Sequence, residues 1–441
     1  MRRIVTKIFG GLLIFVAVLL TLAAATIGTI DRAPARQQDF YKTMMGRLDT
    51  TRLVDRGNSP LKVGWAKVNI TPATNMPMAG YLPRDHFESV HDSLYARILV
   101  IDNGSFRSAM VNVDLLIFPP MLSERIKELN DHNTFLYLSA THTHNGVGGW
   151  DSSLGGRLIT GSFSEDWVND ISAKIDIALK NITVKDATIQ YWEADAADLV
   201  ENRVDVDSGK VDGKLRGLKV LRSDSTRAIL FTFSAHATSI QKDVLELSAD
   251  YPGSTIKELE KKNDFGMFMS GMVGSHRFTF TPENSYDFIG NIAPVVAARI
   301  DTGRYDPAMS APLIRSAHVP IEFGPAQLRI DKDWKINNWA FKFLFRELKG
   351  ELTYLELGDV VFIGTPCDFS GEIYAIDSLE SFAAQHGKHL IITSFNGDYD
   401  GYITYDGHYE TSSKEEINAL NWVGPYYGEY FSTMIKKLVS K

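Results

Sequence analysis

The sequence predicts an α/β fold, with a mixed β-sheet core flanked by helices in one large domain. From Lys62 onward, short, apolar, β-branched segments alternate with helix-like segments. This is the pattern of strands buried on both faces and covered by helices. The chain has 441 residues, enough for one large core or two domains. Its hydrophobic content of 44% and charged content of 23% are ordinary for a globular protein.

Six segments have the composition of buried strands. They span residues 97–102, 108–114, 135–140, 228–233, 360–364 and 390–393. Helices are predicted at residues 165–180, 252–262 and 425–437. The first is the clearest, because Trp167, Ile171 and Ile175 recur four apart and Ser164 can cap the helix. We interpret this apolar stripe as core packing.

The N-terminus predicts a membrane anchor at residues 1–30. Residues 8–30 form an apolar run without charge, and a membrane span needs about 20 such residues. Basic residues precede the run and favour a cytoplasmic N-terminus, with the rest of the chain exported: Arg2, Arg3 and Lys7. A cleavable signal peptide is the alternative, because residues 23–25 are alanines. We favour the anchor, since the run continues past them.

The composition excludes some partners and sites. The net charge is −8 and no basic block is present, which argues against nucleic-acid binding. Cys367 is the single cysteine, so the chain has no intramolecular disulfide and no cysteine-rich structural zinc site.

The most informative stretch of the chain is Ser139-Ala-Thr-His-Thr-His-Asn-Gly-Val-Gly-Gly149. It follows a predicted strand, so His142 and His144, two residues apart, point toward the same side. Histidine is the commonest metal ligand, and α/β proteins place ligands at the carboxyl ends of strands. A pair of hydrogen-bonded loop residues is the alternative interpretation of this spacing.

This stretch resembles the neutral/alkaline ceramidase family, whose members are zinc amidases. Further segments resemble that family in the same order along the chain. They are residues 63–72 with 78–81, residues 233–239 with 248–250, residues 364–370, and residues 399–404 with 408–410. The resemblance runs from about Lys62 to the C-terminus and implies the family's catalytic fold.

The resemblance implies a Zn²⁺ site. His142 and His236 match the two zinc-binding histidines of the family. Asp368 stands where the family has a glutamate ligand, one methylene longer, and Glu372 is a nearby substitute. Tyr402 matches the tyrosine that completes the metal site.

The resemblance also implies roles around the metal. His144 matches a position that contacts the metal ligands or the substrate, and it or Asp368 is a candidate base for a zinc-bound water. Tyr409 matches a tyrosine that binds the reacting carbonyl, and Arg203 matches an arginine lining the substrate site. The family's serine near the substrate has no direct counterpart, and Ser275, one residue late, is the candidate for it.

We therefore expect three regions: an anchor or signal at residues 1–30, a stalk or linker at 31–61, and a ceramidase-like catalytic domain at 62–441 without the family's C-terminal immunoglobulin-like domain. The expected substrate is a lipid amide, N-acylsphingosine, cleaved at a membrane outside the cytoplasm. The alternatives are a hydrolase of another exported amide or ester, and an inactive binding protein of the same fold. The sequence does not predict the oligomeric state.

Overall fold

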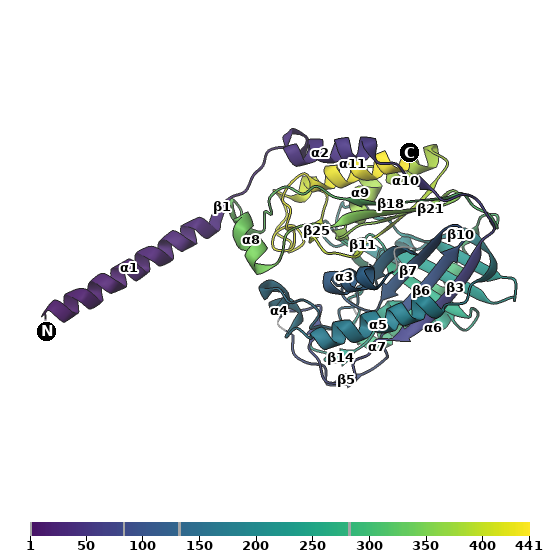
Figure 1. Ribbon diagram of the computed structural model, residues 1–441, viewed down its shortest axis with the longest axis horizontal. Helices are drawn as coiled ribbons and strands as arrows, with labels where there is room; N and C mark the ends of the chain where they lie inside the picture. Colours follow the sequence, from purple (N-terminus) through teal and green to yellow (C-terminus); the bar gives the residue numbers. More distant parts are fainter. Residues whose placement is uncertain (1, 83, 131–133, 281–283) are drawn as a thin grey trace.

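The computed structural model describes residues 2–82, 84–130, 134–280 and 284–441. Two β-sheets stack face to face, and helices cover the outer face of each, so the body has four layers (Figure 1). Both sheets contain parallel and antiparallel pairs. The predicted α/β fold with a mixed sheet core is confirmed.

The larger sheet has nine strands in the order β15-β13-β12-β10-β3-β6-β7-β8, with β17 beside β10. The pairs β13–β15 and β7–β8 are parallel and the others are antiparallel. The strands are β3 (Lys62–Asn69), β6 (Tyr95–Asp102), β7 (Arg107–Val113), β8 (Thr134–Ala140), β10 (Lys185–Asp195), β12 (Lys214–Arg222), β13 (Arg227–Phe233), β15 (Phe265–Ser270) and β17 (Arg304–Tyr305).

The smaller sheet has five strands in the order β2-β18-β21-β22-β24, and only β22–β24 is parallel. The strands are β2 (Val54–Asp55), β18 (Ile314–Pro320), β21 (Glu351–Leu357), β22 (Val360–Gly364) and β24 (His389–Thr393).

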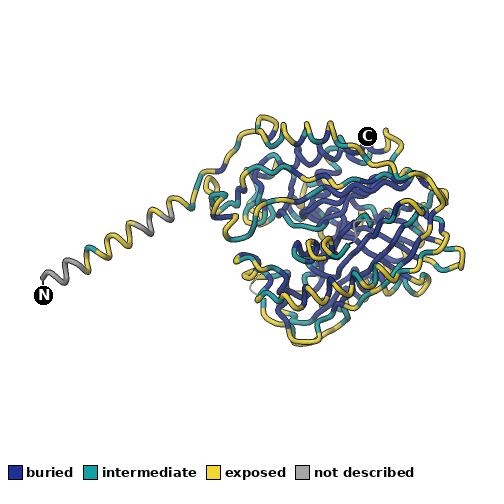
Figure 2. The backbone as a smooth tube through the Cα atoms, in the orientation of Figure 1, coloured by how far each residue is buried: buried dark blue, intermediate teal, exposed yellow. Residues whose placement is uncertain are grey.

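The core lies between the sheets and beneath the helices, and strand alternation divides its residues. On β6, Leu99 and Ile101 face the smaller sheet, where they join Phe362 in one buried cluster. Ile98 and Val100, which alternate with them, pack beneath the helices on the other face. The strands therefore read as continuous apolar runs because both of their faces are buried (Figure 2).

Helices on the larger sheet are α3 (Pro120–Leu129), α5 (Glu165–Asn181), α6 (Asp250–Leu259) and α7 (Ser285–Asp301). Helices on the smaller sheet are α2 (Asp39–Thr50), α9 (Gly371–Ile376), α10 (Leu379–Gln385) and α11 (Tyr427–Val439). The remaining α-helices are α1 (Arg2–Thr26), α4 (Leu154–Thr160) and α8 (Asn338–Leu344). Short 3-10 turns span Ala35–Gln37, Ala197–Leu199 and Asp406–His408.

Short strands brace the loops at the edges of the two sheets. They are β4 (Met78–Ala79) with β9 (Gly146–Val147), β5 (Ser89–Val90) with β14 (Glu246–Leu247), β11 (Val200–Asn202) with β16 (His276–Phe278), β23 (Asp368–Phe369) with β25 (Tyr402–Ile403), and β1 (Ile27–Thr29) with β20 (Trp334–Ile336) and β19 (Arg329–Asp331).

The structure bears out the predicted strands and helices, with ends shifted by a few residues. Ser164 caps α5 as expected, because its Oγ accepts a hydrogen bond from the Trp167 backbone N–H at 3.3 Å. Residues 31–61, expected as a stalk or linker, lie against the body. There, α2 buries Met44 and Leu48 beside the smaller sheet.

Helix α1 extends away from the body (Figures 1 and 2). Among the residues that the structure describes, no helix is long and apolar enough to cross a membrane. The predicted anchor includes positions whose side chains lie outside the described set. The anchor and the exported location therefore stay predictions.

Candidate metal centre

Three histidine side chains meet at one point. His142 and His144 follow the end of β8, and His236 follows the end of β13. The Nε2 atom of His142 lies 2.9 Å from that of His236 and 3.2 Å from that of His144. The Nε2 atoms of His144 and His236 are 3.1 Å apart. The structure thus brings the two predicted metal-binding histidines together. The Nε2 atom of His144 lies at a similar distance from each of them.

Hydrogen bonds at the opposite ring nitrogens fix the tautomer of each histidine. The Nδ1 atoms lie 2.5 Å from the Leu116 carbonyl for His142, 2.7 Å from the Gly80 carbonyl for His144 and 3.2 Å from the Val273 carbonyl for His236. A carbonyl only accepts, so we assign the proton to Nδ1 in all three rings. Each Nε2 then carries a lone pair, and three lone pairs face one another. Only a cation satisfies all three at once.

A metal ion fits this arrangement better than a proton. Burial lowers the pKa of His144 to about 3 and holds the pKa values of His142 and His236 well below the ordinary value. Zn–N bonds of 2.0–2.1 Å in a tetrahedral site place neighbouring nitrogens about 3.3 Å apart. The observed separations of 2.9 to 3.2 Å are close to that spacing.

The backbone around the cluster is strained. His142 has φ of 61°, in the left-handed region that β-carbon contacts disfavour. Its ring stacks on Phe395 with centroids 4.0 Å apart, and Phe395 has φ of 63°. Gly80 has φ of 123°, and a β-carbon there would lie 2.6 Å from the His144 Cα. Unfavourable backbone conformations of this kind concentrate at functional sites.

Asp368 adds a buried carboxylate beside the histidines. Its Oδ1 lies 3.6 Å from the His142 Nε2 and has no hydrogen-bond partner among the described residues. Its Oδ2 accepts a hydrogen bond from the Tyr399 hydroxyl at 2.9 Å. Burial raises the pKa of this carboxyl to about 7, and the positive charge of Arg203 opposes the rise. One carboxylate oxygen is therefore held and the other is free to bind a cation or a proton.

Tyr402 lies beside Asp368, because β25 pairs in parallel with β23 and the two residues are register partners. The Arg203 Nη2 donates to the Tyr402 hydroxyl at 2.9 Å and also lies 3.0 Å from the Glu416 Oε1. Burial raises the pKa of the Tyr402 phenol, while the Arg203 charge works against the rise. Arg203 thus directs its positive charge at the phenol oxygen.

Ser275, Glu372 and Tyr409 are not among the described residues that line the cavity beside the histidines, and neither is His236. The Ser275 Oγ lies 2.9 Å from the His276 Nδ1 and accepts from the Glu372 backbone N–H at 3.2 Å. The Glu372 Oε2 lies 2.8 Å from the His408 Nε2. Tyr409 packs in a small buried cluster, with the Arg329 guanidinium 3.9 Å from its ring centre.

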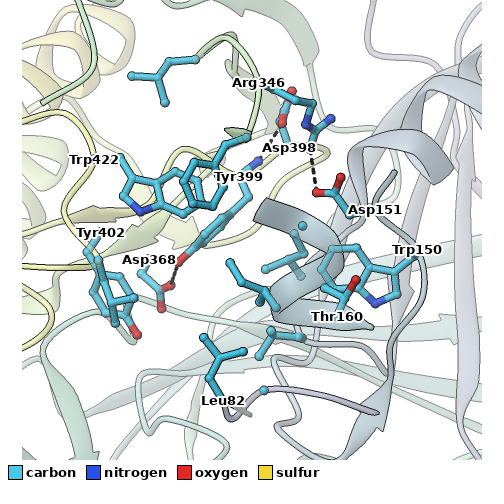
Figure 3. A pocket seen from close by; sticks show the side chains of 18 of the residues that line it. Leu82, Trp150, Asp151, Thr160, Arg346, Asp368, Asp398, Tyr399, Tyr402 and Trp422 are labelled. Carbon is cyan, nitrogen blue, oxygen red and sulfur yellow. Dashed lines mark hydrogen bonds and ion pairs between the residues drawn. The ribbon is translucent and has the colours of Figure 1, made fainter. Parts of the chain in front are cut away.

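A cavity of about 170 Å³ opens beside the three histidines (Figure 3). His142, His144, Asp368 and Tyr402 form one part of its wall. Most of the remaining wall is apolar or aromatic and consists of Leu82, Leu116, Ile117, Trp150, Ile159, Phe341, Phe345, Leu348, Tyr399, Leu420 and Trp422. Charged groups also line it: Asp151, Arg346, Glu347 and Asp398.

The sequence gives no assignment for most of this wall. Tyr399 lies in a segment that resembles the ceramidase family, so its place three residues before Tyr402 is a usable signal. Trp422 and Arg346 lie in segments without a recognisable motif. Arg346 reaches Asp151, with the Nη2 and Oδ2 atoms 3.7 Å apart (Figure 3). These side chains meet only through tertiary folding.

No family model matches the chain. Among solved structures, the chain is similar to the neutral ceramidase from Pseudomonas aeruginosa, with a TM-score of 0.73 and 16% identity over 87% of this chain and 74% of that one. It is also similar to a ceramidase complexed with C2, with a TM-score of 0.71 and 16% identity over 87% and 75% of the two chains. The fold is therefore the fold of these ceramidases.

Proposed function

We propose that the protein is a zinc-dependent amide hydrolase that cleaves N-acylsphingosine into a fatty acid and a sphingoid base. The observation that carries this proposal is the convergence of three histidine Nε2 lone pairs beside the free Oδ1 of Asp368, in the wall of a largely apolar cavity. The ceramidase-like fold supports the choice of substrate class.

His142, His144 and His236 would hold the metal. A donor set of three imidazoles without cysteine suits Zn²⁺. When bound, zinc supplies a Lewis acid that polarises the amide carbonyl and lowers the pKa of water to about 7. The sequence leaves His144 and Asp368 as candidate bases, and the similar spacing of the three Nε2 atoms supports His144 as a third metal ligand instead.

Asp368 would act as the general base. Its free Oδ1 takes the proton of the attacking water, while the hydrogen bond from Tyr399 to Oδ2 fixes the plane of the carboxylate. The same oxygen then returns the proton to the leaving amine. Tyr402, with the charge of Arg203 behind it, would stabilise the negative oxygen that forms on the carbonyl.

Metal analysis combined with hydrolysis of a fluorescent N-acylsphingosine tests this proposal. His142→Ala and His236→Ala should each remove both bound zinc and activity, because each deletes one of three converging donors. His386→Ala, which changes an exposed histidine at the end of α10, is the matched control and should change neither. Full zinc occupancy in both site variants would overturn the assignment.

The charged part of the cavity favours a second substrate class. Arg346 and Asp151 lie on the other side of the cavity from Asp368 in the view of Figure 3, where they could bind polar groups. An exported amide or ester with a polar head group is thus the second candidate. Turnover of such compounds, with none of N-acylsphingosine, would favour it over ceramide.

A further inference from the structure

Two short helices beside the cavity have apolar side chains on both sides. On α4, Ile159 lines the cavity, whereas Leu158 next to it is 79% exposed. On α8, Phe341 lines the cavity, whereas Phe343 is 70% exposed. One side of each helix therefore forms the wall of the cavity, and the other presents large apolar groups to the surroundings.

We call the exposed apolar side chains of these two helices, together with Leu82, the apolar rim. Leu82 both lines the cavity and is 61% exposed, which places the rim at the opening of the cavity. The side chain of Phe345, just after α8, lies within van der Waals distance of Gly155 on α4, so the two helices are neighbours. The rim consists of Leu82, Leu154, Leu158, Trp339 and Phe343.

Helix α1 begins its path away from the body at this rim (Figure 1). The Trp339 Nε1 and the Asn337 Nδ2 donate to the Ala25 carbonyl at 2.9 and 2.7 Å. Seven described side chains of α1 are large, apolar and exposed: Ile8, Phe9, Leu12, Leu13, Ile14, Phe15 and Val16. Helix α1 thus carries a second set of exposed apolar side chains, and the exposure of both sets to water is unfavourable.

We propose that the apolar rim is a docking surface for a lipid bilayer, which brings the opening of the cavity to the membrane interface. Tryptophan, phenylalanine and leucine on short helices are typical of interfacial segments. The charged residues within α4 and α8 are both basic, Arg157 and Lys342. Lys342 forms an ion pair with Glu347, and the exposed Arg157 suits the head-group region. The proposed docking is argued from the apolar rim alone. Only the further step, in which a lipid substrate enters the cavity from the bilayer, rests on the proposed function.

Fluorescence quenching of Trp339 in the full-length protein tests the docking. The probe is a phosphatidylcholine vesicle with brominated acyl chains, which quench a tryptophan that reaches them. Subtracting the signal of Trp339→Phe isolates Trp339 from the other six tryptophans. We expect Trp339-dependent quenching in the parent protein and its loss in the double variant Leu158→Glu with Phe343→Glu.

The matched control is Ile177→Glu with Leu221→Glu, which changes two exposed apolar residues on α5 and β12. It should keep the quenching of the parent. Absence of Trp339-dependent quenching, or an equal loss in both double variants, would overturn the proposal. So would a rim variant that converts a dimer to a monomer in light scattering with no change in quenching, because a second copy would then cover the rim.

These outcomes are independent of the proposed hydrolysis. Quenching without any turnover of N-acylsphingosine would retain the docking surface and reject the activity. Turnover without quenching would retain the activity and reject the docking surface. Vesicle binding through α1 alone, with Trp339 unquenched, would also reject it.

Discussion

Replacing Asp368 with asparagine should separate metal binding from proton transfer. The asparagine side chain has the same size, and its amide oxygen can still accept the hydrogen bond from Tyr399 that now goes to Oδ2. The change removes the basic Oδ1, which lies 3.6 Å from the His142 Nε2 without a partner among the described residues. The three histidine donors stay in place, so zinc should be retained.

Two magnitudes follow from this geometry. Loss of a general base lowers kcat/KM about 10²–10⁴-fold, or about 3–5 kcal/mol of transition-state stabilisation. In the metal-free protein, burial raises the pKa of Asp368 from 3.8 to about 7, so the folded state binds the proton more tightly than the unfolded state. Stability is therefore lost as pH rises between these values, by up to about 4 kcal/mol above pH 7. Asparagine does not titrate, so the Asp368→Asn variant should not lose this stability as the pH rises.

The assay pairs kcat/KM of the zinc-loaded enzyme with chemical unfolding of the chelated protein at pH 5 and pH 8. Asp368→Asn should hydrolyse slowly and, at pH 8, unfold at a higher denaturant concentration than the parent. Asp114→Asn is the matched control: this carboxyl is also buried, its Oδ1 also lacks a described partner, and burial raises its pKa to about 6. Asp114→Asn should stabilise the chelated protein against unfolding at pH 8 and should leave the activity of the zinc-loaded enzyme unchanged. Parental turnover by Asp368→Asn would refute the assignment of the base.

Two further substitutions probe the support of the site. Tyr399→Phe removes the hydrogen bond that lowers the pKa of Asp368, so the acidic limb of the pH profile of kcat/KM should move to higher pH; an unchanged limb would contradict the role of this bond. Gly80→Ala forces a β-carbon to within 2.6 Å of the His144 Cα at φ of 123° and should lower zinc affinity about 10–100-fold, measured by competition with a chelator. Gly46→Ala in α2, where a β-carbon meets nothing within 4 Å, is the control and should leave zinc affinity unchanged.

The sequence predicts the fold well because the strands are locally encoded. Residues 97–102 and 228–233 are mostly apolar and contain β-branched residues, and both become strands buried on two faces. The positions of His142 and His236 at strand ends follow from the same local pattern. Their convergence needs the order of strands in the sheet, which only the family resemblance provides at the sequence level.

Long-range packing decides the parts that the sequence does not predict. Ser275 and Tyr409 occupy motif-like positions, yet Ser275 contacts Ser370, 95 residues away along the chain, and Tyr409 contacts Arg329, 80 residues away. The wall of the cavity combines α4 and α8 through the contact of Phe345 with Gly155. The sequence around Phe345 or Gly155 does not predict this contact, because an aromatic side chain can pack against any apolar surface of suitable shape.

The strain, burial and electrostatics of the centre point to one cause. His142 and Phe395 both adopt left-handed backbone conformations, which cost about 1–3 kcal/mol each. Three neutral imidazoles direct lone pairs at one point, and a neighbouring carboxylate oxygen is buried without a described partner. Each feature alone is unfavourable in a folded protein. A bound cation would be coordinated by these donors and would remove the repulsion among their lone pairs. The chemistry of the donor set is therefore compatible with a metal site, independently of any resemblance to ceramidases.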